Sequence, residues 1–516
     1  MSPVSLAEPQ VTTWKVDLAH EQDTQQLAEE VVLLIGANDL ITLSGDLGAG
    51  KTTFARALIR RLSGEPELEV PSPTFTLMQI YETPRFPIVH ADLYRIKNPD
   101  EIVDLGWDEA SEGALLVVEW ADRLGETAAA DSLDICFTLD LGKSDQARTA
   151  TLTGHGKFAA RLVRARAIHD LLVKGGWGES IRHHMIGDAS SRAYERLVKP
   201  NGETAILMIS PPNPDNTPIR LGKTYSAIAK RAENITAFLA MAEGLRAQGL
   251  SSPKCYAADT SAGLAILEDF GVEGVADAAG PIPERYAEAL QVLAHLHGQD
   301  LPKQVQFGDL THDIPPYDVD ALAIEVELLT DWYVPHVARK SLSSAAKAQF
   351  VNVWRRALHE MIHSKSTWVM RDFHSPNLMW LPQRSGLQRV GLLDFQDCLL
   401  GLPAYDVASL LQDARLTVPD ALEMKLLRDY LAARRAQNVN FDVVDFAKAY
   451  ALMGAQRATK ILGIFARLDK RDAKPQYLKH MPRMEHYLAK GLAHPALRDL
   501  RTWFVDYLPH LVGEVK

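Results

Sequence analysis

The chain has 516 residues, of which 47% are hydrophobic and 23% are charged, and its formal net charge is -11. Since a single hydrophobic core rarely serves more than ~250–300 residues, we expect two or three domains, and the acidic balance argues against a broad cationic surface for DNA. The amino-terminal segment lacks the pattern of a signal peptide and no apolar run approaches the ~18 residues of a membrane span, so we expect a cytoplasmic protein that contacts no membrane.

The first 155 residues are predicted to form a compact α/β domain. An apolar run is followed by a glycine-rich turn and a helical pattern, which is the order strand, loop, helix. A later run, ALLVVE, has the aliphatic and β-branched composition of a buried parallel strand. We therefore expect a P-loop NTPase fold, with a mostly parallel sheet and flanking helices. The expected elements are a helix over 24–35, strands over 40–43, 87–91 and 114–119, and the glycine turn over 45–50.

The glycine turn carries a phosphate-binding motif. Its sequence, GDLGAGKT, fits the pattern GxxxxGK[ST] and lies between the strand and the helix that this pattern requires. Glycines let backbone N–H groups wrap a phosphate chain, the lysine reaches the β- and γ-phosphates, and the last hydroxyl binds Mg²⁺. The residues expected to bind the nucleotide are Gly45, Gly48, Gly50, Lys51, Thr52 and Thr53, with Thr52 also on the metal.

Two acids are candidates for binding the metal and for positioning water. Asp92 follows the strand-like PIVHA, and Glu119 ends the ALLVVE strand. Both are therefore expected at the carboxyl edge of the sheet, where ligands bind in such folds. Each acid alone could equally be a surface charge or a helix cap.

Four segments in this order together resemble the bacterial TsaE family: GDLGAGKTT from Gly45, SPTF from Ser72, HADLYR from His90, and Glu119-Trp120. The resemblance covers about the first 150 residues. It implies an ATPase of the machinery that makes N6-threonylcarbamoyladenosine at position 37 of tRNA. Such an ATPase works with TsaB- and TsaD-like proteins and meets tRNA through that complex. The resemblance also implies that Asp92 acts on Mg²⁺, that residues 72–76 sense the nucleotide, and that Glu119, with a catalytic role, and Trp120 flank it.

A basic helix carrying three arginines is expected over 157–174, and the glycine-rich GGWG follows it. We interpret residues 156–180 as this helix and a linker between two domains. The arginines indicate a solvated helical face more than a docking surface.

Residues 181–516 are predicted to form an α+β domain with the two lobes of a protein kinase. Strand-like segments over 194–199 and 204–209 are joined by Pro-Asn-Gly, a strong hairpin signal. From about Pro283, a favourable first helical residue, helical patterns dominate. They are interrupted by the polar segments MRDFHSPNLMW and GLLDFQD. A small β-rich lobe followed by a larger helical lobe is the layout of a kinase.

The interrupting segments carry the residues of phosphoryl transfer. Asp372 and Asn377 have the RDxxxxN spacing of a kinase catalytic loop, in which the acid takes the proton of the acceptor hydroxyl and the amide binds metal. Asp394 ends a later apolar strand, where kinases place a second metal-binding carboxylate. His374, grouped with the catalytic residues, is expected to orient the loop. Asp406 is expected to cap the next helix or brace the loop.

Other parts of the small lobe are expected to hold ATP. Ser190 and Ser191 lie in a polar turn that could fold over the phosphates. Glu268 follows an apolar strand at the connection between lobes, where backbone groups usually receive adenine. Kinases also carry a lysine on the strand after the phosphate loop, and Met208 stands where it would fall. The cations that could replace this lysine are Arg192, Arg196 and Lys199.

Five segments of this domain resemble the aminoglycoside phosphotransferase superfamily, and within it the AmgK branch: GDASSRAYERL, LEDFG, RDFHSPNL, LDFQD and AYDVASLLQDAR. The resemblance spans roughly residue 181 to the last residue. It implies a sugar kinase that uses ATP and Mg²⁺ to phosphorylate the anomeric hydroxyl of N-acetylmuramate and N-acetylglucosamine in cell-wall recycling. Two alternatives stay open, namely a TsaE-like ATPase with a noncatalytic kinase-like domain, and a kinase of aminoglycosides or other small alcohols.

Overall fold

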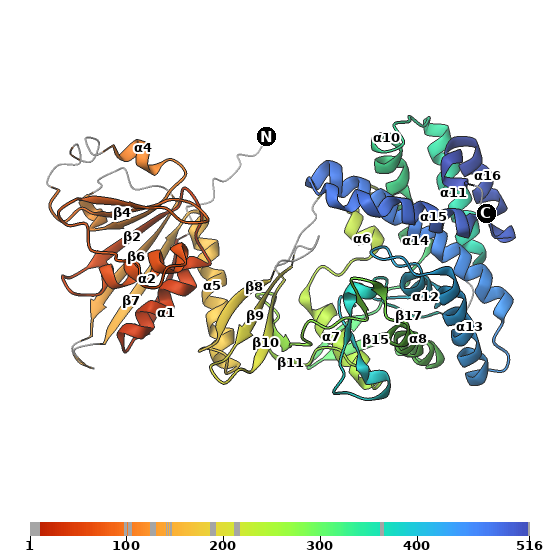
Figure 1. Ribbon diagram of the computed structural model, residues 1–516, viewed down its shortest axis with the longest axis horizontal. Coiled ribbons are helices and arrows are strands. Elements are labelled where there is room, and N and C mark those ends of the chain that lie inside the picture. The colour runs from red at the N-terminus through yellow and green to blue at the C-terminus, as the bar shows by residue number, and fades with distance from the viewer. Residues whose placement is uncertain are drawn as a thin grey trace. The chain divides into compact units, whose positions relative to one another are not determined.

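The structure is a computed structural model that describes residues 11–96, 101, 106–123, 131–140, 142, 144, 147–185, 192–210, 217–361 and 366–513. The chain divides into two compact units, Met1–Lys174 and Gly175–Lys516, and each is described by itself. Figure 1 shows a sheet with helices in the first unit, and a smaller sheet with many helices in the second. Within the described residues, every helix is too short or too polar to span a lipid bilayer.

The first unit contains a seven-stranded mixed sheet in the order β1-β7-β6-β2-β5-β4-β3. The central strands β6, β2, β5 and β4 are parallel, whereas β7, β1 and β3 run antiparallel to their neighbours. The P-loop α/β fold is confirmed, but the sheet is less parallel than expected because antiparallel strands extend both edges. The elements are β1 (Val11–Leu18), α1 (Glu21–Val32), β2 (Leu40–Gly45), α2 (Lys51–Ser63), β3 (Met78–Tyr81), β4 (Ile88–Asp92), α4 (Trp107–Ser111), β5 (Leu115–Glu119), β6 (Ser132–Leu139), β7 (Arg148–His155) and α5 (Lys157–Lys174).

Two helices of the first unit differ from expectation. Helix α1 begins at Glu21 and ends at Val32, three residues earlier than its pattern indicated. The basic helix α5 has the expected bounds, but it lies within the first unit, where it contacts β1 and β7, instead of forming a linker. Its Arg161 donates from Nη1 to Asp39 Oδ2 at 2.6 Å, so this arginine has an internal role.

Side chains of the central strands fill two cores. Ile41, Leu43 and Val117 lie in a large core with side chains of α1, α2 and α5, whereas Leu40 and Val118 lie in a smaller core. Because successive residues of a strand point to opposite faces, an apolar strand can be buried on both faces. The polar side chains of a site must then come from the strand ends and the loops that follow.

The second unit contains a five-stranded sheet in the order β11-β12-β10-β9-β8, in which all neighbours are antiparallel. The predicted hairpin is present, because Thr204 of β10 pairs with Val198 of β9, and Gly202 in the turn has a φ of 84°. The sheet precedes a helical part, so the bilobal kinase-like architecture is confirmed. The strands are β8 (Ile181–Met185), β9 (Ala193–Val198), β10 (Thr204–Ile209), β11 (Cys255–Asp259), β12 (Leu264–Glu268), β13 (Ala276–Asp277), β14 (Gly280–Pro281), β15 (Gln304–Phe307), β16 (Leu310–Asp313), β17 (Thr367–Val369), β18 (Leu378–Trp380), β19 (Val390–Leu392) and β20 (Leu399–Gly401).

The helical part carries the predicted catalytic segment on two short ribbons, in which β17 pairs with β20 and β18 pairs with β19. Helix α8 begins at Pro283, as expected. The α-helices are α6 (Tyr225–Ala229), α7 (Ile235–Ala247), α8 (Pro283–Gly298), α9 (Val319–Leu328), α10 (Val334–His336), α11 (Ser344–Met361), α12 (Ala404–Leu411), α13 (Asp420–Gln437), α14 (Val443–Asp472), α15 (Met481–Leu492) and α16 (Arg498–Tyr507). Five short 3₁₀ segments and one π-helical segment complete the described residues: η2 (Leu329–Tyr333, π), η3 (Ser375–Asn377), η4 (Gly386–Arg389), η5 (Pro475–His480), η6 (Pro495–Leu497) and η7 (Pro509–Val512).

Helix α14 contacts α9, α12 and α15 and buries polar side chains, among them Gln456, Arg457 and Lys460. At Gly463 it passes the end of α9 so closely that a Cβ would lie 2.3 Å from the carbonyl carbon of Leu328. The glycine therefore sets the distance between the two helices. This distance in turn sets where the buried polar side chains of α14 can reach.

We predict that Gly463→Ala lowers the free energy of unfolding of the second unit by about 1–3 kcal/mol, although alanine has the better helix propensity. The reason is that the added methyl group meets backbone atoms, which cannot turn away. Urea unfolding of the whole chain measures this effect. Gly513→Ala is the matched control, because nothing lies within 4 Å of its Cβ position. Equal midpoints for the two variants would contradict the prediction.

Candidate active sites

The first unit has a cavity of about 440 Å³ beside the ends of β2, β4 and β5. Arg148 lines this cavity, although the sequence analysis did not predict a role for it. It reaches the cavity because β7, which it begins, pairs with β6 in the sheet. The predicted residues that line the cavity are Gly48, Gly50, Lys51, Thr52, Thr53, Asp92, Glu119 and Trp120.

Two glycines of the motif are required by the backbone. Gly45 has a φ of 121°, and a Cβ there would lie 2.1 Å from the carbonyl oxygen of Phe137 in β6. Gly50 has a φ of 113° and precedes the first residue of α2. Residues other than glycine rarely adopt such positive φ values. The glycines therefore turn the chain sharply from β2 into α2.

Lys51 is folded back over the motif. Its Nζ donates hydrogen bonds to the carbonyl oxygens of Gly45 at 2.7 Å and Asp46 at 2.9 Å, and it lies 4.1 Å from the centre of the Trp120 ring. Burial lowers the pKa of Lys51, and the nearby carboxylates of Glu119 and Asp92 partly oppose that effect. The lysine thus sits among groups that a bound phosphate chain would have to replace.

The carboxylate of Asp92 is held by the loop before β3. Its Oδ2 accepts hydrogen bonds from Ser72 Oγ and Thr74 Oγ1, each at 2.7 Å, and its Oδ1 accepts one from the Tyr94 N–H at 3.0 Å. The loop over residues 72–76, expected to sense the nucleotide, therefore contacts the acid expected to bind metal.

Glu119 lies next to Asp92, because the two residues are partners at the ends of the paired strands β5 and β4. Its two carboxylate oxygens each lie 3.0 Å from Thr52 Oγ1, which donates to them, and its Oε1 is 3.1 Å from His90 Nε2. His90 is fully buried, and its Nδ1 has no partner among the described residues. Sequence reasoning gave His90 no role, although it stands two residues before Asp92.

In the second unit, the structure brings the three predicted phosphoryl-transfer residues together. Asn377 Nδ2 donates to the carbonyl oxygen of Asp372 at 2.9 Å, which leaves the amide oxygen of Asn377 available to a ligand. Gln396 Nε2 donates to Asp394 Oδ1 at 2.8 Å and orients it. Arg371 and Asp394 both have positive φ values, 65° and 55°, and such strain outside glycine is typical of functional loops.

Two buried carboxylates brace the catalytic loop. Asp406 accepts hydrogen bonds from the N–H groups of Met370 at 2.6 Å and Arg371 at 3.0 Å, so its bracing role is present. Asp413, which the sequence reading did not select, accepts one from the Ser375 N–H at 2.8 Å. His374 Nδ1 lies 3.9 Å from Asp413 Oδ1, near that carboxylate but without a hydrogen bond among the described residues.

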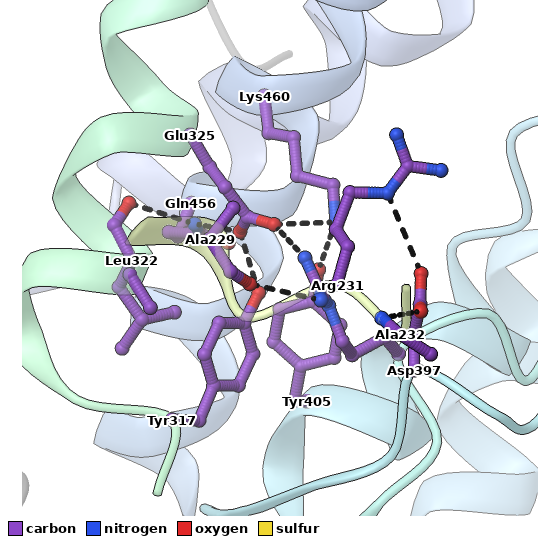
Figure 2. Close-up of polar contacts among 12 residues, drawn as sticks. Ala229, Arg231, Ala232, Tyr317, Leu322, Glu325, Asp397, Tyr405, Gln456 and Lys460 are labelled. Atoms are coloured by element: carbon purple, nitrogen blue, oxygen red, sulfur yellow. Dashed lines mark hydrogen bonds and ion pairs between the residues drawn. The ribbon is translucent and has the colours of Figure 1, made fainter. Parts of the chain in front are cut away.

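A buried polar cluster anchors the loop to distant helices (Figure 2). The carboxylate of Glu325 in α9 is bonded to the guanidinium of Arg371 and lies 3.2 Å from Lys460 Nζ in α14. Lys460 also donates to Tyr405 Oη at 3.1 Å, and Tyr317 Oη donates to Glu325 at 2.5 Å. All of these charged side chains are buried. Two cations therefore share one anion directly behind the predicted base.

This charge excess acts on Asp372. Burial raises the pKa of its carboxyl, but Lys460, His374, Arg371 and Arg457 together bring the pKa below its ordinary value. Asp394 behaves in the opposite way, because burial and the neighbouring Asp372 raise its pKa. The geometry therefore holds Asp372 ionised, as a proton acceptor must be.

Only some of the residues expected to hold ATP in the kinase-like unit lie in the part of the chain that the structure describes. Ser190 and Ser191 lie outside the described residues. Glu268 is tied into the sheet, because its side chain is bonded to Arg384 and its N–H donates to the Lys254 carbonyl at 2.8 Å, so its contact with adenine stays a prediction. Met208 is fully buried in β10.

The three cations proposed to replace the missing lysine have different partners. Arg192 Nη1 lies 3.2 Å from Asp394 Oδ1. Arg196 Nε pairs with Asp269 at 2.8 Å, and Lys199 pairs with Glu203 at 3.0 Å. Arg192 is therefore the one of the three that reaches a predicted metal-binding residue.

Comparison with known proteins matches one family to each unit. The family described as threonylcarbamoyl adenosine biosynthesis protein TsaE matches residues 18–149, and the phosphotransferase enzyme family matches residues 185–442. An N-acetylmuramate/N-acetylglucosamine kinase of Caulobacter vibrioides is 39% identical over 350 residues, covering 66% of this chain and 95% of the relative. The tRNA threonylcarbamoyladenosine biosynthesis protein TsaE of Rickettsia typhi is 46% identical over 105 residues, covering 20% of this chain and 72% of the relative. The chain belongs to both families.

A second kinase with the same name, from Pseudomonas aeruginosa, is 28% identical over 337 residues, covering 64% of this chain and 90% of that protein. The TsaE match includes the P-loop, Asp92 and Glu119, and the phosphotransferase match includes Asp372, Asn377 and Asp394. The resemblances inferred from short motifs are thus confirmed over long stretches of both units.

We predict that Glu325→Gln lowers the free energy of unfolding of the second unit by about 3–5 kcal/mol, the usual cost of leaving a buried charge without its partner. Arg371 and Lys460 would then face each other without a carboxylate. The double variant Glu325→Gln, Lys460→Met should recover part of the loss, since it removes one of the two cations. Urea unfolding of the four proteins in the cycle tests this, and unchanged stability of Glu325→Gln would show that the cluster is not needed for folding.

Proposed function

We propose that this chain is a bifunctional ATP-dependent enzyme. Its TsaE unit hydrolyses ATP for the formation of N6-threonylcarbamoyladenosine at position 37 of tRNA. Its kinase unit transfers the γ-phosphate of ATP to the anomeric hydroxyl of N-acetylmuramate or N-acetylglucosamine in cell-wall recycling. The observation that carries the proposal is that each unit gathers its own phosphate-transfer residues, around the P-loop in one and around Asp372 in the other.

In the TsaE unit, the contacts support a nucleotide site with a metal. Gly48, Gly50 and Lys51 line the cavity as phosphate ligands, and the oxygens of Thr52 and Asp92 form a donor set that suits a hard cation such as Mg²⁺. When bound, that ion neutralises charge on the phosphates. Glu119 is proposed to orient the attacking water, and Trp120 to lie beside the nucleotide. The partners proposed for this unit are TsaB- and TsaD-like proteins, with tRNA held through them.

In the kinase unit, the proposed acceptor is an amino sugar, following the names of the relatives. Asp372 would take the proton of the anomeric hydroxyl as that oxygen attacks the γ-phosphorus, while the bond from this phosphorus to the β,γ-bridging oxygen breaks and ADP leaves. Asn377 and Asp394 would hold Mg²⁺, which their oxygen atoms suit, and Arg192 would meet the phosphates in place of the strand lysine. His374 would keep the loop in position. Both reactions use ATP and one concerns tRNA, so we expect the protein in the cytoplasm.

A second candidate has an observation in its favour. The buried Met208 where kinases carry a lysine would suit a kinase-like domain that binds a sugar or a partner without transferring phosphate. Incubating the protein with labelled ATP and a panel of amino sugars and aminoglycosides, and resolving free phosphate from sugar phosphate, separates the candidates. Free phosphate with no sugar phosphate would favour this second candidate.

We predict that Lys51→Ala abolishes ATP hydrolysis by the TsaE unit while sugar phosphorylation continues, because the two sites share no residue. Asp372→Asn should do the reverse, with at least a ~100-fold loss of sugar phosphorylation and little change in ATP affinity, as expected for a lost general base. Phosphate release and sugar phosphate are measured on each folded variant. If Lys51→Ala removed both activities, the two sites would not be independent.

We also predict that Arg192→Met raises the KM for ATP of the kinase unit by about 10-fold, since one charge-assisted contact to a phosphate is lost. Lys199→Met is the matched control, because Lys199 pairs with Glu203 and not with Asp394. Sugar phosphorylation in the Lys51→Ala background isolates the kinase site. Equal KM values for both variants would remove Arg192 as the replacement for the strand lysine.

A further inference from the structure

Arg148 is an unpaired cation that lines the P-loop cavity of the first unit. Its guanidinium takes part in none of the hydrogen bonds or ion pairs among the described residues, and its Nε is buried. Lys51, which lines the same cavity, differs in this respect, because its Nζ donates to the carbonyl oxygens of Gly45 and Asp46. Buried polar groups are almost always paired, so an arginine without a partner beside a cavity indicates a ligand.

The strand pairing puts Arg148 at the edge of the sheet from which the P-loop emerges. Arg148 is the first residue of β7 and pairs with Leu139, the last residue of β6, in antiparallel register. Because β6 runs parallel to β2, the end of β6 lies at the same edge as Gly45, the last residue of β2. The antiparallel strand β7 therefore begins at the edge where ligands bind in such sheets.

The side chain of Arg148 lies against the backbone of the phosphate-binding motif. A Cβ at Gly50 would lie 3.5 Å from Arg148 Cδ and 3.6 Å from its Nη1. Gly50 is the residue that caps the amino-terminal end of α2, where backbone N–H groups are directed at a bound phosphate. The guanidinium of Arg148 is therefore within reach of the oxygens of a phosphate chain that the motif wraps.

Arg148 approaches the motif from the side opposite to the two acids of the site. In the strand order β7-β6-β2-β5-β4, the strand β2 separates β6 and β7 from β5 and β4 (Figure 1). Glu119 ends β5 and Asp92 ends β4, whereas Arg148 begins β7. The γ-phosphate belongs on the side of Glu119, which is proposed to orient the attacking water. The rest of the phosphate chain then extends along the motif toward β6 and β7, where Arg148 lies.

We propose that Arg148 is a nucleotide-binding residue of the TsaE unit, and that its guanidinium binds the α- and β-phosphates, which ATP and ADP share. This proposal rests on the proposed ATP hydrolysis by that unit and names a further ligand of the same site. A guanidinium fork matches phosphate oxygens geometrically, and the buried Nε gains the partner that it lacks.

The contact has a kinetic consequence that separates it from the contacts of Glu119. An interaction that is equally strong before and after the γ-phosphate is cleaved stabilises the bound nucleotide and the transition state alike. Its loss raises the KM and leaves kcat almost unchanged. Arg148 should therefore govern the affinity for both nucleotides and not the rate of the chemical step.

The test measures phosphate release by the full chain without sugar, in the Asp372→Asn background, which silences the kinase site. We expect Arg148→Met to raise the KM for ATP and the inhibition constant of ADP by the same factor, about 10- to 100-fold, with kcat changed by less than about threefold. Arg148→Lys, which keeps the charge but loses the fork, should lie between. Arg164→Met is the matched control, since Arg164 is an exposed arginine on α5 of the same unit, and it should leave both constants unchanged.

Three kinetic results would overturn the assignment. Unchanged constants with an unchanged kcat would show that Arg148 does not touch the nucleotide. A lower kcat with unchanged constants would mean that it acts in the transition state alone, and a higher KM for ATP with an unchanged constant for ADP would place it on the γ-phosphate. Should Arg148→Met unfold at a lower urea concentration than its parent, Arg148→Gln replaces it under the same criteria.

Failure of ATP hydrolysis is a separate outcome. If the Asp372→Asn protein releases no phosphate, the proposed ATPase function fails, and the binding of ADP then decides the role of Arg148. Titration calorimetry with ADP, on the unchanged chain and on Lys51→Ala, identifies the P-loop site by its loss in that variant. Arg148→Met must weaken that site by at least about 10-fold. Equal affinity there, or a chain without a Lys51-dependent site, would overturn the proposal.

Discussion

Glu325 is buried inside the kinase unit, and its carboxylate is shared by Arg371 from the catalytic loop and Lys460 from α14. An ion buried in this way is costly unless its partners are held in good geometry. The helices α9 and α14 must therefore keep their spacing, which the close approach at Gly463 fixes. The loop is held by the same requirement, because Arg371 cannot move without giving up its own buried pairing with Glu325.

The surplus cation of this cluster also has a chemical consequence. A general base must be ionised before it can accept a proton, and burial alone would favour the neutral acid. Lys460 and Arg371 lower the pKa of Asp372 against the effect of burial, whereas burial and the charge of Asp372 raise the pKa of Asp394. Thus the contacts that stabilise the loop also make its two acids different from each other.

The groups proposed to bind phosphate are positioned differently in the two units. The TsaE unit uses backbone: three glycines of its motif have positive φ values, and the helix α2 begins at the lysine. The kinase unit uses side chains held by remote helices, with Asp406 and Asp413 accepting hydrogen bonds from backbone N–H groups of the loop. The first arrangement is compact in sequence, and the second spans many segments.

That difference decides how much the sequence could predict. The P-loop lies within eight consecutive residues, and the RDxxxxN loop within seven, so the pattern of each short segment identifies it in the sequence. The order of strands and helices likewise indicated an α/β unit followed by a bilobal kinase-like unit, because hydrophobic periodicity is a local property. The edge strands of the first sheet were missed, since their pairing depends on neighbours distant in the chain.

Tertiary structure alone decided which remote side chains join each site. Arg148 reaches the P-loop cavity only through the pairing of β7, and Glu325 and Lys460 meet Arg371 only because α9 and α14 cross beside the loop. The burial of Glu325 and Lys460 could not be read from the sequence either, since glutamate and lysine side chains are seldom fully buried. The sequence by itself determined the motifs and the families and predicted the reacting groups, because these depend on neighbouring residues. The charges that tune and orient those groups come from packing between segments far apart in the chain, which only the folded structure specifies.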